Sequence, residues 1–236
     1  MLSVLYSAAG GLNAAEKSQE VLARNIASAA HHGYKRATLT FADELHNAGS
    51  DAVRIAADEG IAFEQGDILR TDAPCDLALE GDGFFTLQRP DGSLLYTRNG
   101  SFLLGDDGRV VTSTGLTLLG ENGPILLSPG SRPVVSADGT VLDNGQPAGK
   151  LRISTFPDKS VLRRAGTTLF EEPGQVSTAM PAVDTKVRQG CLERSNVNVL
   201  TEMVRMIENA RNHQASQRIT SSVDAAFRSL TRAAEE

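Results

Sequence analysis

The chain has 236 residues, of which 40% are hydrophobic and 5% aromatic, with no tryptophan. This apolar content is enough for a core in one or two domains. The formal net charge is -6 and no run of lysine or arginine occurs, which argues against a nucleic-acid partner or an anionic membrane surface. Cys75 and Cys191 lie far apart with no C-x-x-C pattern, so neither a disulfide framework nor a zinc site is indicated.

The N-terminal stretch has neither the features of a membrane span nor those of a secretory leader. No run approaches the ~18 apolar residues of a transmembrane helix. Residues 1–11 lack a basic start and are interrupted by polar residues and two glycines. We therefore expect no membrane insertion and no cleaved signal peptide, which leaves a cytoplasmic protein or one exported by another route.

Residues 2–30 carry a seam with alternating steps of three and four, which predicts a helix with a heptad pattern. The seam consists of Leu5, Ala8, Leu12, Ala15, Gln19, Leu22 and Ile26. Gly33 ends this pattern, so residues 1–36 are expected to be an N-terminal helical segment. A helix packed on its own domain would show the same stripe, but a second stripe at the other end of the chain favours pairing of the two.

The middle of the chain changes character twice. Residues 37–69 are mixed and predict an extended linker with exposed contact surface. From residue 70 to 170, short apolar runs alternate with Asp-Gly and Asn-Gly pairs, which supply the tight turns of an antiparallel all-β domain. The turn residues are Asp82, Asp91, Asn99, Asp107, Asn122, Asp138 and Asn144. Residues 171–194 contain Pro173 and Pro181 and predict a return linker.

Residues 195–236 predict a long C-terminal helix, because no proline or glycine occurs after residue 195. Asn198 is a suitable N-cap, and Glu202 then lies where the helix dipole favours an anion. The apolar stripe consists of Leu200, Met203, Val204 and Ile207, and resumes at Ile219, Val223 and Leu230. The predicted fold class is therefore α+β: the two long terminal helices pair as a coiled coil, and a central antiparallel all-β domain lies between them in sequence.

Candidate chemistry is sparse. His31, His32, His46 and His213 do not show metal-ligand spacing. No nucleophile elbow occurs, and the pair of glycines around Asp82 suits a hairpin turn better than a phosphate loop. We expect no catalytic residue, no cofactor, no metal and no small-molecule substrate.

Several segments resemble motifs of the bacterial flagellar basal-body rod and hook family. They are Asn25-Ile26-Ala27, Gly33-Tyr34-Lys35-Arg36, Gln65-Gly66-Asp67-Ile68, the stretch from Thr71 to Phe85, the stretch from Tyr96 to Phe102, and the stretch from Gln189 to Asn198 followed by Met203 to Ile207. The resemblance covers nearly the whole chain. The chain departs from the family pattern at residues 28–32 and at Gln214, Ala215 and Ser216.

The resemblance implies a non-enzymatic subunit of the periplasmic rod, exported by the flagellar type III apparatus. Its partners would be copies of itself, other rod and hook subunits and that apparatus, and its assembly would transmit torque from the motor to the hook. The predicted interface residues are Leu5, Ala8, Leu12, Ala15, Leu22, Asn25, Ile26, Asn196, Asn198, Leu200, Met203, Val204, Ile207, Ile219, Val223 and Leu230.

Modest length and residues 218–224 favour the proximal rod type over the distal one, although other segments suit both types. A wall-binding β domain with helical dimerisation arms is an alternative, but it would need aromatic platforms for sugars, and the chain has few aromatic residues. A wall-cutting enzyme would need an acid or nucleophile pair. The sequence indicates no such pair.

Overall fold

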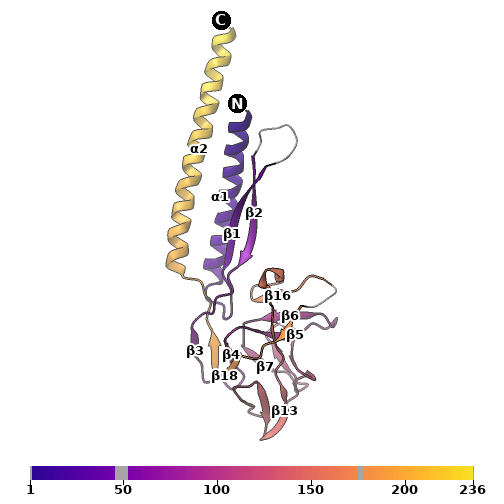
Figure 1. Ribbon diagram of the computed structural model, residues 1–236. Helices are drawn as coiled ribbons and strands as arrows, with labels where there is room; N and C mark the ends of the chain where they lie inside the picture. Colours follow the sequence, from indigo (N-terminus) through magenta and orange to yellow (C-terminus); the bar gives the residue numbers. More distant parts are fainter. Residues whose placement is uncertain (1, 46–52, 175–177, 236) are drawn as a thin grey trace. The chain divides into compact units, whose positions relative to one another are not determined.

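The computed structural model describes residues 2–45, 53–174 and 178–235 (Figure 1). The chain forms two compact units. The first unit comprises Met1–Ala27, Ala37–Ala62 and Asn198–Glu236, and the second comprises Ser28–Arg36 and Phe63–Val197. The chain therefore passes between the two units four times.

The first unit contains two helices and a hairpin, namely α1 (Leu2–Ser28), β1 (Ala37–Leu45), β2 (Val53–Ile61) and α2 (Val199–Glu235). The strands β1 and β2 are antiparallel, and Ala37 lies opposite Ile61. The hairpin runs beside α1 (Figure 1), to which it is joined by an ion pair of 2.5 Å between Arg24 and Glu59. The segment predicted as an extended linker thus contributes two paired strands. Among the described residues, no helix is long and apolar enough to cross a membrane.

The start of α2 confirms the predicted N-cap. The side-chain oxygen of Asn198 accepts a hydrogen bond of 3.1 Å from the backbone N–H of Thr201, one of the donors that the first turn of a helix leaves unpaired. The helix then continues to Glu235 without a break. This continuity follows from the absence of proline and glycine.

We expect Asn198→Ala to lower the free energy of unfolding by about 1 kcal/mol, because the Thr201 N–H loses its partner. Urea unfolding followed by far-ultraviolet circular dichroism measures this change. The matched control is Asn212→Ala, which removes an exposed amide from the interior of the same helix. Since alanine is the better helix former, this control should leave stability unchanged or slightly higher. Equal losses in both variants would contradict the capping role.

The prediction that the terminal helices pair as a coiled coil is wrong. Within the described residues, α1 and α2 share no continuous apolar seam and meet through polar side chains. The Asn209 amide donates to the Ala15 carbonyl at 2.8 Å and to the Gln19 side chain at 3.1 Å. A groove of about 560 Å³ lies between the helices and is lined by Ala15, Glu16, Gln19, Glu20, Ala23, Asn209, Ala210, His213, Gln214 and Gln217. Knobs-into-holes packing would leave no such groove.

The direction of the apolar stripe on α2 explains the error. Successive helical residues are rotated by about 100°, so Glu202 and Asn209, seven residues apart, lie on the same side of α2. Both contact α1. By the same rotation, Leu200, Val204 and Ile207 lie roughly on the opposite side. The stripe on α2 therefore points away from α1, and the two stripes do not meet within one chain.

The second unit is almost entirely β. Its main sheet has ten strands, with the path β15-β16-β6-β5-β9-β8-β7, and β10, β14 and β17 attached beside it. Their bounds are β5 (Phe84–Gln88), β6 (Leu94–Thr97), β7 (Phe102–Leu104), β8 (Val110–Thr112), β9 (Thr117–Gly120), β10 (Gly123–Pro124), β14 (Ile153–Thr155), β15 (Arg163–Arg164), β16 (Leu169–Glu171) and β17 (Met180–Pro181). The strand pairs of this sheet are antiparallel among the described residues, as predicted for this part of the chain.

Smaller sheets complete the unit. A three-stranded sheet contains β11 (Val134–Val135), β12 (Thr140–Asp143) and β13 (Gln146–Lys150). A short 3-10 helix covers Lys159–Val161. The strands β3 (Ile68–Arg70) and β4 (Leu77–Glu80) pair with β19 (Cys191–Glu193) and β18 (Lys186–Gln189), respectively. The segment predicted as a return linker therefore pairs with the start of the β unit.

The hairpin turns occur largely where the Asp-Gly and Asn-Gly pairs predict them. Gly139 and Gly145, for example, have φ of 85° and 81°, the left-handed region that favours glycine. The pair Asn99-Gly100 is an exception, because Gly100 is not among the glycines with positive φ. It is instead needed for close packing, because a Cβ there would collide with the Leu77 carbonyl. The Leu77 N–H donates a hydrogen bond of 3.0 Å to the Gly100 carbonyl.

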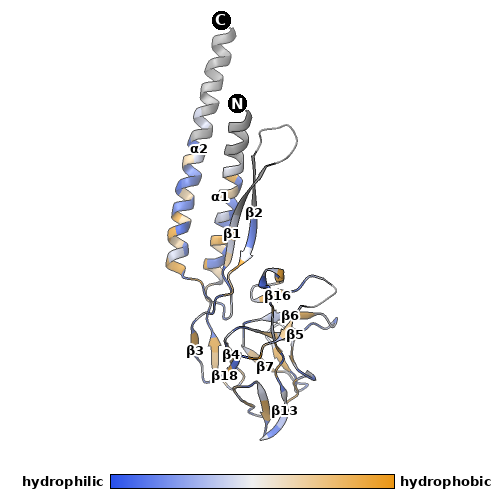
Figure 2. Cartoon of the chain, in the orientation of Figure 1, coloured by the Kyte–Doolittle hydropathy of each residue, from blue (hydrophilic) through white to orange (hydrophobic). Residues whose placement is uncertain are grey.

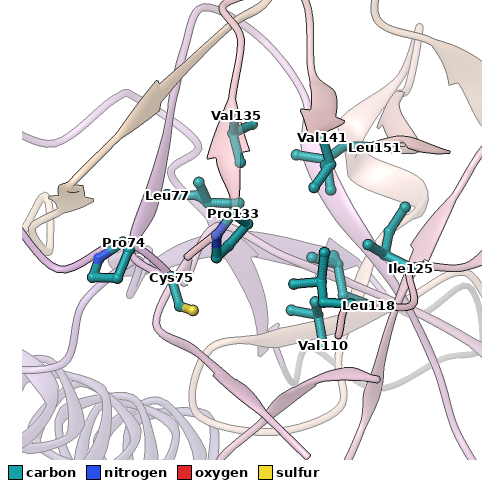
Figure 3. A pocket seen from close by; sticks show the side chains of 11 residues that line it. Pro74, Cys75, Leu77, Val110, Leu118, Ile125, Pro133, Val135, Val141 and Leu151 are labelled. Carbon is teal, nitrogen blue, oxygen red and sulfur yellow. The ribbon is translucent and has the colours of Figure 1, made fainter. Parts of the chain in front are cut away.

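The core of the second unit lies between its sheets and is apolar. Its fully buried members include Leu79, Phe85, Leu87 and Leu118. A void of about 20 Å³ remains in it, lined by the side chains in Figure 3, Cys75 among them. This volume holds about one water molecule and is far below that of a ligand pocket. Cys75 and Cys191 are both free thiols, and burial raises the pKa of Cys75.

Candidate functional site

A buried cluster of three charged residues joins distant parts of the second unit. Lys35 follows α1, Arg98 follows β6, and Glu193 ends β19, and all three side chains are at most 2% exposed. The Lys35 ammonium donates to the Glu193 carboxylate at 2.6 Å and to the Glu64 carbonyl at 2.6 Å. Arg98 donates to the other Glu193 oxygen at 3.3 Å. One carboxylate thus binds two cations from separate segments.

Backbone groups add further hydrogen bonds to this cluster, although the buried Nε of Arg98 has no partner among the described residues. The Gly66 N–H donates to Glu193 at 3.0 Å, and Arg98 donates to the Gly81 carbonyl at 2.7 Å. Burial lowers the pKa of Lys35 and of Arg98, and the charge of Glu193 acts in the opposite direction on both. Because burial is the larger effect, each cation depends on its partner to remain charged inside the protein.

Asn196, three residues beyond the end of β19, forms a second link. Its side-chain oxygen accepts from the Arg36 N–H at 2.7 Å, and its amide donates to the Glu64 carbonyl at 3.1 Å. Its own N–H donates to the Tyr34 carbonyl at 3.4 Å. Three chain segments, around residues 34–36, 64–66 and 193–196, are therefore bound to one another at the point where each connects to the first unit.

Close backbone packing holds the segment of Lys35 in place. Gly33 has φ of 69°, and a Cβ at this residue would collide with the backbone of Arg98 and Asn99. The Gly33 N–H donates to the Glu193 carbonyl at 2.7 Å. Outside this contact, the Arg164 guanidinium lies 4.7 Å from the ring centre of Tyr34 and donates to the Lys35 carbonyl at 2.7 Å. The link after α1 is thus enclosed by residues from four other segments.

The motifs that the sequence analysis singled out meet in this cluster, which we call the motif junction. It is formed by Lys35 and Arg36, Glu64 and Gly66, Gly81, Arg98, and Glu193 with Asn196. These residues are separated by up to 161 positions in sequence, yet they share hydrogen bonds. The charged groups of the junction bind one another and backbone groups of separate segments, so its role is that of a structural lock.

A corresponding polar contact holds the first unit together at the end of α1. The Asn25 side chain is 1% exposed and forms two hydrogen bonds of 2.9 Å with the backbone of Ala37 in β1. It also donates to Glu202 of α2 at 3.0 Å. One amide therefore joins α1, β1 and α2. The buried carboxylate of Glu202 is further bound by Arg205 at 3.0 Å.

The exposed surface that stands out in the first unit is the stripe on α2. Its members are Leu200, Met203, Val204 and Ile207, with exposed fractions of 76%, 45%, 55% and 55%. Figure 2 shows apolar colour where α2 begins. Four large apolar side chains at helical spacing on an open face are typical of a surface that packs against another helix. We call this set the α2 stripe.

The structure places the other predicted interface residues in several environments. Leu22 and Asn25 are buried, whereas Leu12, Ala15, Ile26 and Asn196 are partly buried, and Asn198 is exposed as the cap. The amides of Asn25 and Asn196 bind their own chain. The helix α2 also contains Ile219, Val223 and Leu230, and α1 contains Leu5 and Ala8. The side chains of these five residues are outside the described part of the structure, and so is His46.

Comparisons with known proteins point to one family. Residues 78–143 match the family described as the flagellar hook protein FlgE/F/G D1 domain, and residues 188–233 match the C-terminal family of the flagellar basal body rod FlgEFG proteins. The flagellar basal-body rod protein FlgG of Buchnera aphidicola subsp. Acyrthosiphon pisum is 30% identical over 98% of this chain and 99% of its own. The chain belongs to the flagellar basal-body rod proteins. It is of the FlgF/FlgG type.

One further relative named FlgG and one named FlgF support the assignment to the FlgF/FlgG type. The rod protein FlgG of Borreliella burgdorferi is 32% identical over 95% of this chain and 96% of its own. The rod protein FlgF of Caulobacter vibrioides is 30% identical and covers 83% of both chains. As a rod protein, the chain is a structural subunit of the flagellar basal body. The C-terminal family match contains both Glu193 and the α2 stripe.

Sequence reasoning about the rod protein missed the roles of Lys35, Arg98 and Glu193. All three lie in segments that resemble motifs of the family, but each is one charged residue among many in the sequence. In the sequence, Glu193 directly follows the apolar residue Leu192, as many exposed carboxylates follow an apolar residue. Nothing local distinguishes it from a solvated carboxylate. Its burial depends on cations that lie 158 and 95 positions earlier.

Proposed function

We propose that this chain polymerises through its first unit into the axial shaft of the flagellar basal body and transmits torque along it. The observation that carries the proposal is the α2 stripe, which the chain itself leaves uncovered. A contact in which the stripe of one copy packs on a different surface of the next copy is heterologous, and its repetition with a rotation that does not close gives a filament.

The proposed interface residues are those of the two terminal helices. The α2 stripe and the seam of α1 would pack on helices of neighbouring subunits, and residues 1–36 and 195–236 would supply most of the subunit contacts. The β-rich segment 70–170 and the connecting segments 37–69 and 171–194 would contribute further contacts. We expect the subunit to have no catalytic activity, because its relatives are structural proteins of the flagellar rod.

Deletion of the chromosomal gene tests the proposal. The expected result is non-motile cells whose isolated basal bodies are arrested before a complete rod, as seen by electron microscopy. A plasmid copy of the gene should restore swimming. Normal filaments and normal swimming after deletion would overturn the rod function, provided that no second rod gene of the same type is present.

Within the rod, we propose the proximal position, on the basis of the residues at 218–224 and the modest length. The distal position is the second candidate: relatives named FlgG cover 98% of this chain, and a relative named FlgF covers 83% of it. The stage of arrest in the deletion strain distinguishes the two. An arrest with no rod beyond its base supports the proximal position, and a rod that lacks only its outer length supports the distal one.

We further propose that the subunit reaches the rod through the flagellar type III export apparatus and assembles with other rod and hook subunits. The family membership supports assembly of this kind. A strain that lacks export function should retain the chain in the cytoplasm, whereas a strain that lacks only the hook should release it or incorporate it into rods. Fractionation followed by immunoblotting measures both.

A further inference from the structure

The positive and negative charges of the motif junction come from different parts of the chain. Its two buried cations, Lys35 and Arg98, come from the first half of the sequence, and their carboxylate comes from the last strand of the unit. Among the described residues, Glu193 is the only carboxylate that hydrogen-bonds to either cation. Asp82 lies nearby, but its side chain is 72% exposed and binds Lys159 at 2.9 Å.

The residues next to Glu193 add further bonds to the same early segments. The Arg194 N–H donates to the Asp67 carbonyl at 2.8 Å, and the Asn196 side chain binds Arg36 and Glu64. Leu192 pairs with Leu69 across β19 and β3. Without residues 192–196, the segment around Lys35 would therefore lose its counter-charge and most of its backbone partners at once.

The main sheet does not depend on these residues in the same way. Its central strands β5, β6, β8 and β9 pair with one another, and their core contains Phe85, Leu87, Leu95 and Leu118. The pairings of these four strands join residues 84–120, and the core also includes Leu79 of β4 and Val187 of β18. No residue of this core lies in β19, so the core of the sheet needs no contact with that strand. The burial of Lys35 and Arg98 without a carboxylate is, in contrast, strongly unfavourable.

We propose that Glu193 is the closing residue of the second unit, and that the link at residues 33–36 remains open and solvated until β19 brings this carboxylate into the junction. Closing then orders three connecting segments in one step. If the chain polymerises as proposed above, only a complete chain would present an ordered link to the unit that makes the subunit contacts. The closing step itself does not depend on that function.

Limited proteolysis of the purified full chain tests the proposal directly, because trypsin cleaves after lysine and arginine and two such residues, Lys35 and Arg36, lie in the link. In the native chain, this site is expected to resist cleavage. In Glu193→Gln, which keeps the shape but removes the charge, cleavage after these residues should be roughly a hundredfold faster, as mass spectrometry of the fragments would show. Sites beside the main sheet, such as Arg109 immediately before β8, should keep their native rate.

Two control variants separate this effect from others. Glu171→Gln removes a carboxylate from a partly exposed pair with Arg89 and should leave cleavage of the link unchanged. Leu118→Ala destabilises the core of the main sheet and should increase cleavage throughout the unit. If Glu193→Gln behaves like Leu118→Ala, or cleaves at the native rate, the closing role is wrong.

Refolding of the native chain tests the proposed order of folding without any substitution. During refolding, pulsed hydrogen exchange should protect amides of the main sheet, such as that of Leu87, before those of Gly33 and Gly66, which bind Glu193. Protection of Gly33 and Gly66 together with the sheet, or before it, would overturn the proposed order. A failure of the rod function would leave this result unaffected, so the two proposals fail independently.

Discussion

Cells in which Ile207→Asp replaces the native chain are expected to lose motility and to contain no complete rods. Ile207 lies in the middle of the α2 stripe and is 55% exposed in the single chain, so the substitution should not unfold it. On assembly, however, the carboxylate would be buried without a partner, at a cost of about 3–5 kcal/mol for each contact. Since the cost recurs at every subunit, assembly should fail. Leu12→Asp on α1 is expected to act in the same way.

The control for this prediction is Asn212→Asp, which adds the same charge to α2 at an exposed residue outside the stripe. Swimming assays and electron microscopy of basal bodies compare the strains, and proteolysis of the purified variants checks that the second unit remains folded. Normal rods in Ile207→Asp would exclude the α2 stripe from the subunit contacts. Loss of rods in both variants would show that α2 tolerates no added charge, whichever face carries it.

Lys35→Met is expected to lower the free energy of unfolding of the second unit by about 3–5 kcal/mol, because it leaves the Glu193 carboxylate and the Glu64 carbonyl with fewer donors in a buried site. Urea unfolding measures the loss. In a double-mutant cycle with Glu193→Leu, the two losses should not add, and the coupling should be about 1–3 kcal/mol. Additive losses would show that the pair contributes nothing beyond its separate contacts.

The matched control is Lys159→Met, which removes a lysine from a pair with the exposed carboxylate of Asp82. Surface pairs contribute little, so the loss should stay below about 1 kcal/mol. The hydrogen bond from Lys159 lowers the pKa of Asp82, but water screens this pair. A loss as large as that of Lys35→Met would mean that burial is not the reason for the importance of the junction.

The sequence was sufficient for features that depend on neighbouring residues. The uninterrupted course of α2 follows from the lack of proline and glycine, and the cap at Asn198 follows from a side chain that reaches the next turn. The turns at Gly139 and Gly145 follow from the conformational freedom of glycine after an Asp or Asn. Together with the motif order, these local features also indicated the family.

Only the tertiary structure decided which sides of the elements face one another. Periodicity showed that α2 has an apolar side, but the contacts of Glu202 and Asn209 with α1 determine that this side points away, and so exclude the coiled coil. The strands β1 and β2 were likewise not apparent within the mixed segment 37–69. The local pattern shows which side of a helix or strand is apolar, and long-range contacts decide what that side packs against.

The motif junction is the clearest example of a feature that tertiary contacts determine and local sequence does not. The sequence contains Lys35, Arg98 and Glu193 as three ordinary charged residues, and composition predicts that such residues are solvated. Their burial is favourable only when all three are present in one place, since each compensates the desolvation of another. The burial of these three residues depends on contacts between segments 95 and 158 residues apart. The spacing of neighbouring residues does not encode such contacts, which form only when the chain folds.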